Sequence, residues 1–201
     1  MISWTNFSVM LVSAFLFSCF YIKSVGPAAL EKKIGKAAYS RCGKYRLIAS
    51  VFEIIVVINY IIYFFYPLQV PLLLRVFPWD WWISILAAAL IAIPAGYLLI
   101  RGLKDAGRES IIPEKKNMLH KGIYRKIRHP QAAGELLLWW VIALLLNSPF
   151  LVLLSFIWIP IFYLFCRAEE KDLIIRYGSR YLEYRKNTGF IIPKRMGKKR
   201  Y

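Results

Sequence analysis

The chain has 201 residues, of which 59% are apolar, and its 28 Lys and Arg residues outnumber its 11 Asp and Glu residues to give a formal net charge of +17. High hydrophobicity and high charge can coexist only if they are separated along the chain, and the charges here do lie outside the apolar segments. The composition therefore excludes an ordinary soluble domain and predicts an integral membrane protein.

Three charge-free apolar segments occupy the first half of the chain. A helix needs about 20 mainly apolar residues to cross a bilayer, and residues 1–22, 54–74 and 81–100 meet this requirement. The first segment lacks the basic start of a signal peptide, so we expect an uncleaved span whose N-terminus lies outside. Residues 1–100 are therefore predicted to form three transmembrane helices, with a basic cytoplasmic loop over residues 23–46.

A fourth apolar segment, residues 136–166, is free of charge over its whole length. As a single helix it would be roughly 46 Å long at the helical rise per residue, which is too long for a hydrocarbon core of about 30 Å. The tripeptide Asn147-Ser148-Pro149 lies inside it and is typical of a turn and helix start. We therefore predict a tight transmembrane hairpin over residues 130–166, which brings the number of spans to five.

The basic residues gather in three segments, 23–46, 101–128 and 167–201. Five spans place all three segments on one side of the membrane, and the positive-inside bias makes that side cytoplasmic, together with the C-terminus. The net charge is then explained by topology and by contact with anionic lipid headgroups. Without a recognition motif to accompany the charge, nucleic acid is not expected as a partner.

Candidate site residues are polar groups at membrane depth, because such groups are costly there. The sequence contains no G-x-G-x-x-G, P-loop or paired C-x-x-C motif, so no metal site is expected. Arg128, His129 and Pro130 end the second basic segment, where Pro130 suits the first position of a helix and His129 its N-cap. His129 could bind an anionic ligand group there, or it could cap the helix while Arg128 touches a lipid phosphate.

Acidic residues stand near both ends of the predicted hairpin, Glu135 within its first turns and two others after its last residue. Glu135 is either an acid that the helix dipole favours and that reaches toward water, or a group that faces the bundle interior and binds a cation. Glu169 and Glu170 follow Arg167 at the exit of the last span. As neighbours on a helix they point about 100° apart, so we expect only one of them to face a given cavity. The alternative is an ordinary charged helix with i,i+4 pairing.

A series of tyrosines follows these acids. Tyr177, Tyr181 and Tyr184 fall on one helical face, provided that Gly178 does not break the helix. Such a stripe forms either an interfacial anchor and packing surface or part of a cofactor site.

The order of these features is more specific than any one of them. The ordered set is Gly122-x-Tyr124-x-x-x-Arg128-His129-Pro130, Gly134-Glu135, an apolar hairpin, Glu169-Glu170, and Tyr177-Gly178-x-x-Tyr181-x-x-Tyr184. Over about residues 101–193 it resembles the integral-membrane methyltransferase superfamily, which contains isoprenylcysteine carboxyl methyltransferases and phospholipid N-methyltransferases.

The predicted fold is an all-α integral membrane protein with five transmembrane helices and a C-terminal helical hairpin, and the resemblance implies cytoplasmic loops that bind the cofactor over this hairpin. Residues 101–201 would hold the cofactor-binding loop, the hairpin and a cytoplasmic C-terminal helix. S-adenosylmethionine would be the cofactor and a lipophilic molecule the methyl acceptor. The cofactor site would comprise Gly122, Tyr124, Arg128, His129, Pro130, Glu170, Tyr181 and Tyr184. The acceptor would lie near Glu169, Arg167 and Glu135, and Glu169 could take the proton of an amine acceptor.

Differences from the family pattern narrow the choice of acceptor. Ala132 stands where the family commonly has Tyr. The prenylcysteine enzymes carry an Arg at the position of Phe165, and Arg167 lies about 200° further around a helix. Carboxyl methylation of prenylcysteine is therefore not expected. Two alternatives stay open at this point: a sterol-reductase-like enzyme with a nicotinamide cofactor, and a non-enzymatic scaffold that binds anionic lipid.

Overall fold

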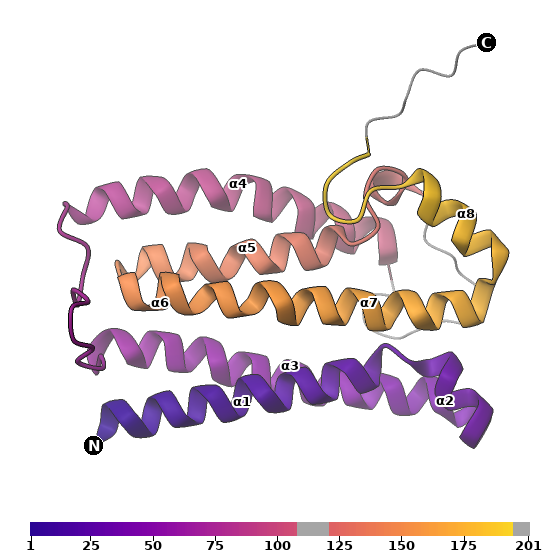
Figure 1. The fold of residues 1–201 in the computed structure, drawn as a ribbon, viewed down its shortest axis with the longest axis horizontal. Helices are drawn as coiled ribbons and strands as arrows, with labels where there is room; N and C mark the ends of the chain where they lie inside the picture. Colours follow the sequence, from indigo (N-terminus) through magenta and orange to yellow (C-terminus); the bar gives the residue numbers. More distant parts are fainter. Residues whose placement is uncertain (108–120, 195–201) are drawn as a thin grey trace, which may run out of the picture.

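The computed structural model describes residues 1–107 and 121–194. Within these residues all regular elements are helices, which confirms the all-α prediction, and one isolated β-bridge joins two loops. The elements, in chain order, are α1 (Ile2–Ser24), α2 (Pro27–Ile34), α3 (Ala37–Phe65), α4 (Trp81–Ala106), η2 (Gly122–Arg125), α5 (Pro130–Leu145), α6 (Pro149–Leu154), η3 (Ser155–Ile157), α7 (Trp158–Tyr177) and α8 (Ser179–Asn187), as drawn in Figure 1.

Four helices are long and apolar enough to cross a membrane: α1, α3, α4 and the rod Pro149–Tyr177, which combines α6, η3 and α7. Their outer faces carry large apolar side chains. On α4, for example, Leu90 is 65% exposed and Ile93 is 72% exposed, as suits a surface in contact with lipid. These helices support a multi-pass membrane protein. α5 is apolar but has 16 residues, about 24 Å at the helical rise, so a fifth span stays a prediction.

The second long helix does not have the predicted boundaries. We expected a span over residues 54–74 after a basic loop over 23–46, but α3 runs over Ala37–Phe65 and α2 fills much of the remaining basic segment. The helix ends early because Pro67 has no N–H to donate and disfavours helical geometry at Tyr66 before it. The basic segment is therefore mainly helical, and α3 carries its charged residues continuously into the apolar bundle.

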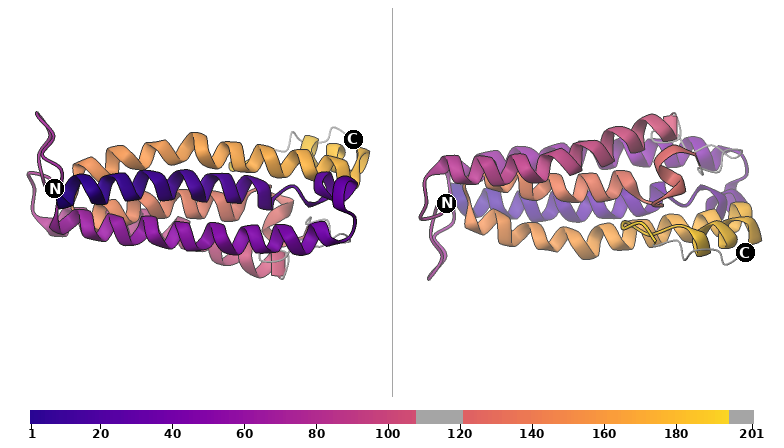
Figure 2. Two further views of the ribbon diagram at one scale, coloured as in Figure 1. Left: turned by 90° about the horizontal axis from the view of Figure 1, so that it is seen from below. Right: turned by 90° about the horizontal axis from the view of Figure 1, so that it is seen from above.

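The bundle consists of two helix pairs joined by the rod. α1 packs along α3, and α4 packs along α5, while α7 contacts α1, α2 and α5 (Figures 1 and 2). Aromatic side chains fill the interior between the pairs. Trp139 on α5 stacks on Trp158 of the rod with ring centroids 4.3 Å apart, and Trp158 Nε1 donates to the Tyr60 hydroxyl on α3 at 3.2 Å. α3, α5 and the rod thus share one core.

The hairpin tip has the predicted turn. Asn147 adopts a positive φ of 49°, and the Ser148 hydroxyl accepts from the Leu151 N–H at 3.3 Å, so Ser148 caps α6. Further down the hairpin, Gly134 on α5 lies against the α4 backbone. A Cβ at Gly134 would lie 2.6 Å from the carbonyl oxygen of Ala95. The two helices are therefore in direct backbone contact at this point.

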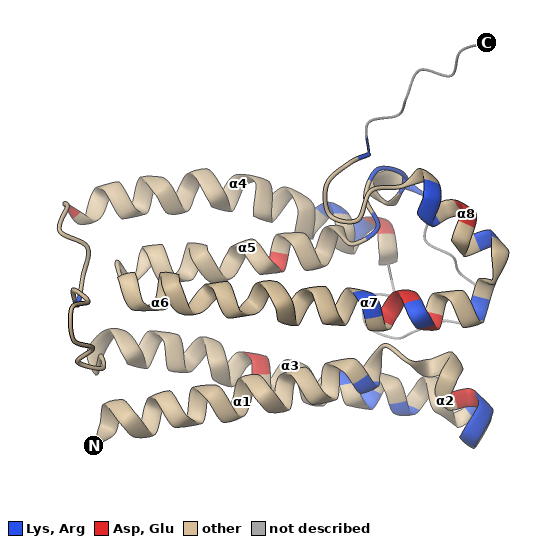
Figure 3. Ribbon diagram, in the orientation of Figure 1, with Lys and Arg blue, Asp and Glu red and all other residues tan. Residues whose placement is uncertain are grey.

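The charged residues gather at one end of the bundle, as predicted (Figure 3). We call this the basic end; it carries α2, α8 and the loop 121–129. At this end Asp172 of α7 caps α2 from another part of the chain. Its Oδ1 accepts from the N–H groups of Ala28 at 2.8 Å and Ala29 at 3.1 Å, while Arg176 Nε donates to Oδ2 at 2.7 Å. A buried carboxylate thus fixes the N-terminal helices to α7.

The close approach of α4 and α5 at Gly134 predicts that alanine substitutions at Gly134 and Gly96 have opposite effects on stability. Gly134→Ala should lower the free energy of unfolding by about 1–3 kcal/mol, because the added methyl group forces α5 away from α4. Gly96→Ala on α4, where a Cβ meets nothing within 4 Å, should stabilise by up to about 1 kcal/mol through its higher helix propensity. Unfolding by SDS in mixed micelles measures both; equal effects of the two substitutions would contradict the backbone contact.

Candidate active site

The loop before α5 is held against the ends of α4 and α5 at the basic end. Gly122 has a φ of +53°, and a Cβ there would collide with the Asp105 carboxylate on α4. That carboxylate accepts from the N–H of Ile123 at 2.8 Å. The Tyr124 hydroxyl donates to the Gly102 carbonyl at 3.3 Å and accepts from Gln131 at 2.9 Å. Gly122 and Tyr124 therefore fix the loop, and the Tyr124 hydroxyl is hydrogen-bonded to other residues of the protein.

The chain after α8 folds back onto this loop. Ile127 pairs with Gly189 in a parallel β-bridge, and the His129 N–H donates to the Phe190 carbonyl at 3.1 Å. The Tyr184 hydroxyl donates to the Tyr124 carbonyl at 2.6 Å. Two segments some sixty positions apart in sequence thus form one layer over the entrance to α5.

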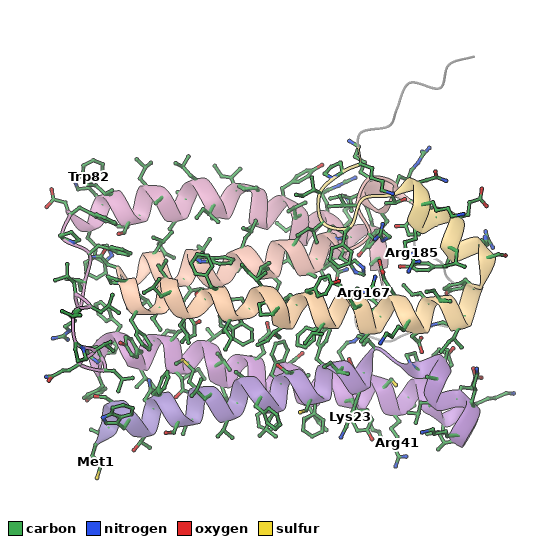
Figure 4. The ribbon with its side chains drawn as sticks, viewed as in Figure 1. Met1, Lys23, Arg41, Trp82, Arg167 and Arg185 are labelled. Carbon is green, nitrogen blue, oxygen red and sulfur yellow. The ribbon has the colours of Figure 1, made fainter. Side chains whose placement is uncertain are left out.

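Glu170 lies at the centre of this layer and is 1% exposed. Arg128 Nε donates to its Oε1 at 2.7 Å, while Arg167 and Arg185 lie 3.3 Å and 3.9 Å from its Oε2. Arg128 Nη1 also donates to the carbonyls of Arg185 and Thr188. Arg128 therefore links the loop, α7 and the end of α8 through one planar guanidinium. Figure 4 shows Arg167 and Arg185 side by side at this end.

His129 lies between the two neighbouring acids of α7. Its Nδ1 is 3.4 Å from Glu169 Oε2, and its Nε2 is 3.4 Å from Glu170 Oε1. The prediction that only one of these acids would face a given site is wrong, because the buried ring lies between their directions and meets one acid with each nitrogen. His129 occupies the N-cap of α5 but makes no side-chain capping bond, and Pro130 takes the first helical position as predicted.

The acids and a thiol set the charge of His129. Burial alone would lower its pKa, but hydrogen bonds to Cys166, Glu169 and Glu170 outweigh burial and raise the pKa well above the ordinary value of 6.5. Both ring nitrogens then carry a proton, as two carboxylate partners require. Glu170 is fully enclosed, whereas the Glu169 side chain is 39% exposed. Glu169 is thus the acid of the pair that a ligand can reach.

A helix break separates Tyr177 from the other two tyrosines of the predicted stripe. Gly178 has a φ of +56° and ends α7 at Tyr177, so Tyr177 does not share a helix with Tyr181 and Tyr184. Tyr181 is 2% exposed, and its hydroxyl has no hydrogen-bond partner among the residues described. Burial first, and the charges of Glu170 and Glu169 next, raise the pKa of Tyr181, so the hydroxyl stays a neutral donor.

The three residues predicted near the acceptor are divided between two places. Glu169 and Arg167 belong to the His129 cluster, whereas Glu135 lies further into the bundle and hydrogen-bonds to Glu53 of α3. Sequence analysis did not single out Glu53, nor Arg46, whose charge acts favourably on Glu169 from α3. Arg46 and Glu53 are seven residues apart, which is the spacing of one helix face and the one sequence signal that could have found them.

The region that contains this site is similar to a known protein family. Residues 82–180 match the phospholipid methyltransferase family. The part of the chain that builds the site thus belongs to this family. The matched residues run from the start of α4 into α8 and include His129, Glu169 and Glu170. Members of the family use S-adenosylmethionine. This assignment favours the methyltransferase prediction over the reductase-like and scaffold alternatives.

Two curated relatives are similar over shorter stretches. A methanethiol S-methyltransferase of a Pseudomonas species is 33% identical over 128 residues, which are 62% of this chain and 46% of that protein. The protein-S-isoprenylcysteine O-methyltransferase of Saccharomyces cerevisiae is 34% identical over 113 residues, which are 52% of this chain and 46% of that protein. The chain thus spans about half the length of these relatives. No solved structure was found to match it.

The contacts of Arg128 predict that another positively charged side chain at this position cannot maintain the stability of the protein. Arg128→Lys should lower the free energy of unfolding by about 2–4 kcal/mol, because lysine cannot serve Glu170 and two carbonyls at once, and Glu170 is too buried to recruit water. Arg125→Lys is the matched control, since Arg125 is exposed in the same loop, and it should change stability by less than about 0.5 kcal/mol. Unfolding in mixed micelles measures both, and equal losses would contradict this role.

The His129 cluster also predicts a pH dependence. Because the folded pKa is raised, the cluster's contribution to stability is complete below about pH 6.5, the unfolded value, and is lost as the pH rises through the folded pKa. NMR of a His120→Gln variant, in which His129 is the one remaining histidine, measures that pKa directly. Glu169→Gln should lower it. A folded pKa at or below 6.5 would contradict the cluster.

Proposed function

We propose that the protein transfers a methyl group from S-adenosylmethionine to a lipophilic acceptor that reaches the site from the bilayer. The observation that carries the proposal is the His129–Glu169–Glu170 cluster, which lies within the family match, where the basic end meets the apolar bundle. A water-soluble donor and a membrane-soluble acceptor can meet only at such a boundary. The N-terminus would lie outside and the basic end on the cytoplasmic side, against anionic headgroups.

The residues of the site suit this chemistry. When bound, S-adenosylmethionine supplies an electrophilic methyl group on a cationic sulfur, and the protein must mainly position the two reactants and exclude water. Glu169 offers an accessible carboxylate for a cationic or hydroxyl group, and the Tyr181 hydroxyl is a buried donor with no partner within residues 1–107 and 121–194. Arg128 and Glu170 hold His129 in place, with Gly122, Tyr124 and Tyr184 fixing the layer around it.

Binding of the methyl donor to the full chain in nanodiscs tests this proposal. The protein should bind labelled S-adenosylmethionine, His129→Ala should weaken that binding severely, and reduced nicotinamide should not compete. Absence of donor binding, or binding of the nicotinamide in its place, would refute the proposed activity.

Two tyrosines give a sharper prediction. Tyr181→Phe should weaken donor binding about tenfold, the effect of about one hydrogen bond, without lowering the free energy of unfolding, because its hydroxyl has no hydrogen-bond partner among the described residues. Tyr184→Phe should instead lose about 1 kcal/mol of stability, because it removes the bond to the Tyr124 carbonyl. Donor titrations and unfolding curves for both variants make the comparison. A loss of stability in Tyr181→Phe with normal binding would assign that hydroxyl a purely structural role.

A further inference from the structure

The connection between α3 and α4, residues 66–80, closes the end of the bundle opposite the basic end (Figure 1). Its backbone is held on the tip of the hairpin, where the Phe77 N–H donates to the Asn147 carbonyl at 3.3 Å. Directly after it, Trp81 Nε1 donates to the Leu145 carbonyl at 2.9 Å. The connection, the start of α4 and the hairpin tip therefore form one surface.

The exposed side chains of this surface place it at the depth of lipid headgroups. The connection exposes Leu72 and Leu74, which suit contact with a membrane. Tyrosine and tryptophan are enriched where a membrane meets water, and the surface exposes four of them: Tyr66, Trp79, Trp81 and Trp82. Figure 4 shows Trp82 at this end of the bundle, away from Arg167 and Arg185 at the basic end.

Two cavities adjoin each other on this surface. The first, of 390 Å³, lies between the end of α3, the start of α4 and the hairpin tip, and most of its lining is aromatic or aliphatic. The second, of 420 Å³, lies along the connection and is more polar, with Ser3 and Gln69 in its wall. The residues that line both cavities are Phe65, Pro67 and Arg75. An apolar and a more polar cavity therefore meet at one cationic side chain.

Arg75 has no anionic partner at this meeting point. It is the one Lys or Arg in residues 66–100, and it is exposed, with no hydrogen bond or ion pair within residues 1–107 and 121–194. A guanidinium offers five donors in a planar fork that fits the oxygens of a phosphate. At headgroup depth, beside an apolar cavity, its charge complements the phosphate of a lipid.

We propose that Arg75 binds the phosphate of one phospholipid in the leaflet opposite the basic end. The headgroup occupies the cavity along the connection, and the first carbons of an acyl chain enter the apolar cavity beside the hairpin tip. This lipid is not the methyl acceptor. Leu146, which lines the apolar cavity, and His129 lie at opposite ends of α5, about 25 Å apart along its axis. The lipid instead joins α3, the connection and the hairpin tip, and the proposal does not depend on the proposed methyl transfer.

A photoreactive phospholipid maps this contact on the full chain. The protein in dodecyl maltoside, a detergent without phosphate, is given phosphatidylglycerol with a diazirine in one acyl chain, and mass spectrometry locates the adducts. In the wild type they should fall on residues 63–67, 75–81 and 146–148. Arg75→Gln should reduce these adducts at least tenfold. Arg41→Gln removes the same charge from an exposed position at the basic end (Figure 4) and should leave them unchanged.

A second variant tests the apolar cavity separately from the charge. Val76→Trp keeps Arg75 and places a large side chain in the lining of that cavity, so it should also reduce the adducts at least tenfold. Without lipid, Arg75→Gln should keep the Tm of the wild type, because an exposed side chain without a partner contributes little to stability. Equal adducts in the wild type and Arg75→Gln would overturn the proposal.

Competitors that lack one part of the lipid identify the occupant. Unlabelled dioctanoylphosphatidylglycerol should remove the adducts. Dioctanoylglycerol, which has the same chains and no phosphate, and inorganic phosphate, which has no chain, should each compete at least tenfold less well. Equal competition by dioctanoylglycerol would show an apolar contact only, and equal competition by inorganic phosphate would show a simple anion site. Either result would overturn the phospholipid site.

Discussion

The buried ion pair between Arg128 and Glu170 is the interaction on which the arrangement of the site depends. Burying two charges is favourable only if the geometry satisfies both completely, and here the guanidinium also serves two carbonyls at the end of α8. The loop, α7 and the C-terminal segment must therefore lie in one arrangement for either charge to be satisfied. His129 is placed by that arrangement, because its neighbour in sequence and one of its partners are the two members of the pair.

Local chemistry made some of this structure predictable. Pro130 and the Asn147-Ser148-Pro149 turn define helix starts by their own covalent and capping properties, so the start and the turn of the hairpin could be predicted. The predicted end at residue 166 is wrong, because α7 continues to Tyr177. The start of α3 could not, because its first turns carry charge without an apolar pattern. The meeting of both neighbouring acids at His129 depends on how α5 packs beside α7. The contact between Glu53 and Glu135 joins helices from the two halves of the chain, so residue spacing within one segment could not predict it.

The family match does not cover the N-terminal helices. Residues 82–180 contain the His129 cluster, whereas Tyr21, Arg46 and Glu53 come from helices before the match. The two curated relatives are named for a thiol and for isoprenylcysteine, so membership of the family does not define the acceptor.

The capping of α2 by Asp172 has a consequence for how the protein is made. The two N–H groups at the start of α2 find their acceptor more than a hundred positions later in the chain. While the ribosome is still producing the first three long helices, that helix start has no protein partner, and the α1–α3 pair can insert but cannot be completed. Synthesis of α7 closes the contact. The N-terminal cap of α2 is therefore completed only with the last long helix, and a chain that ended before α7 would leave these two N–H groups without their carboxylate acceptor.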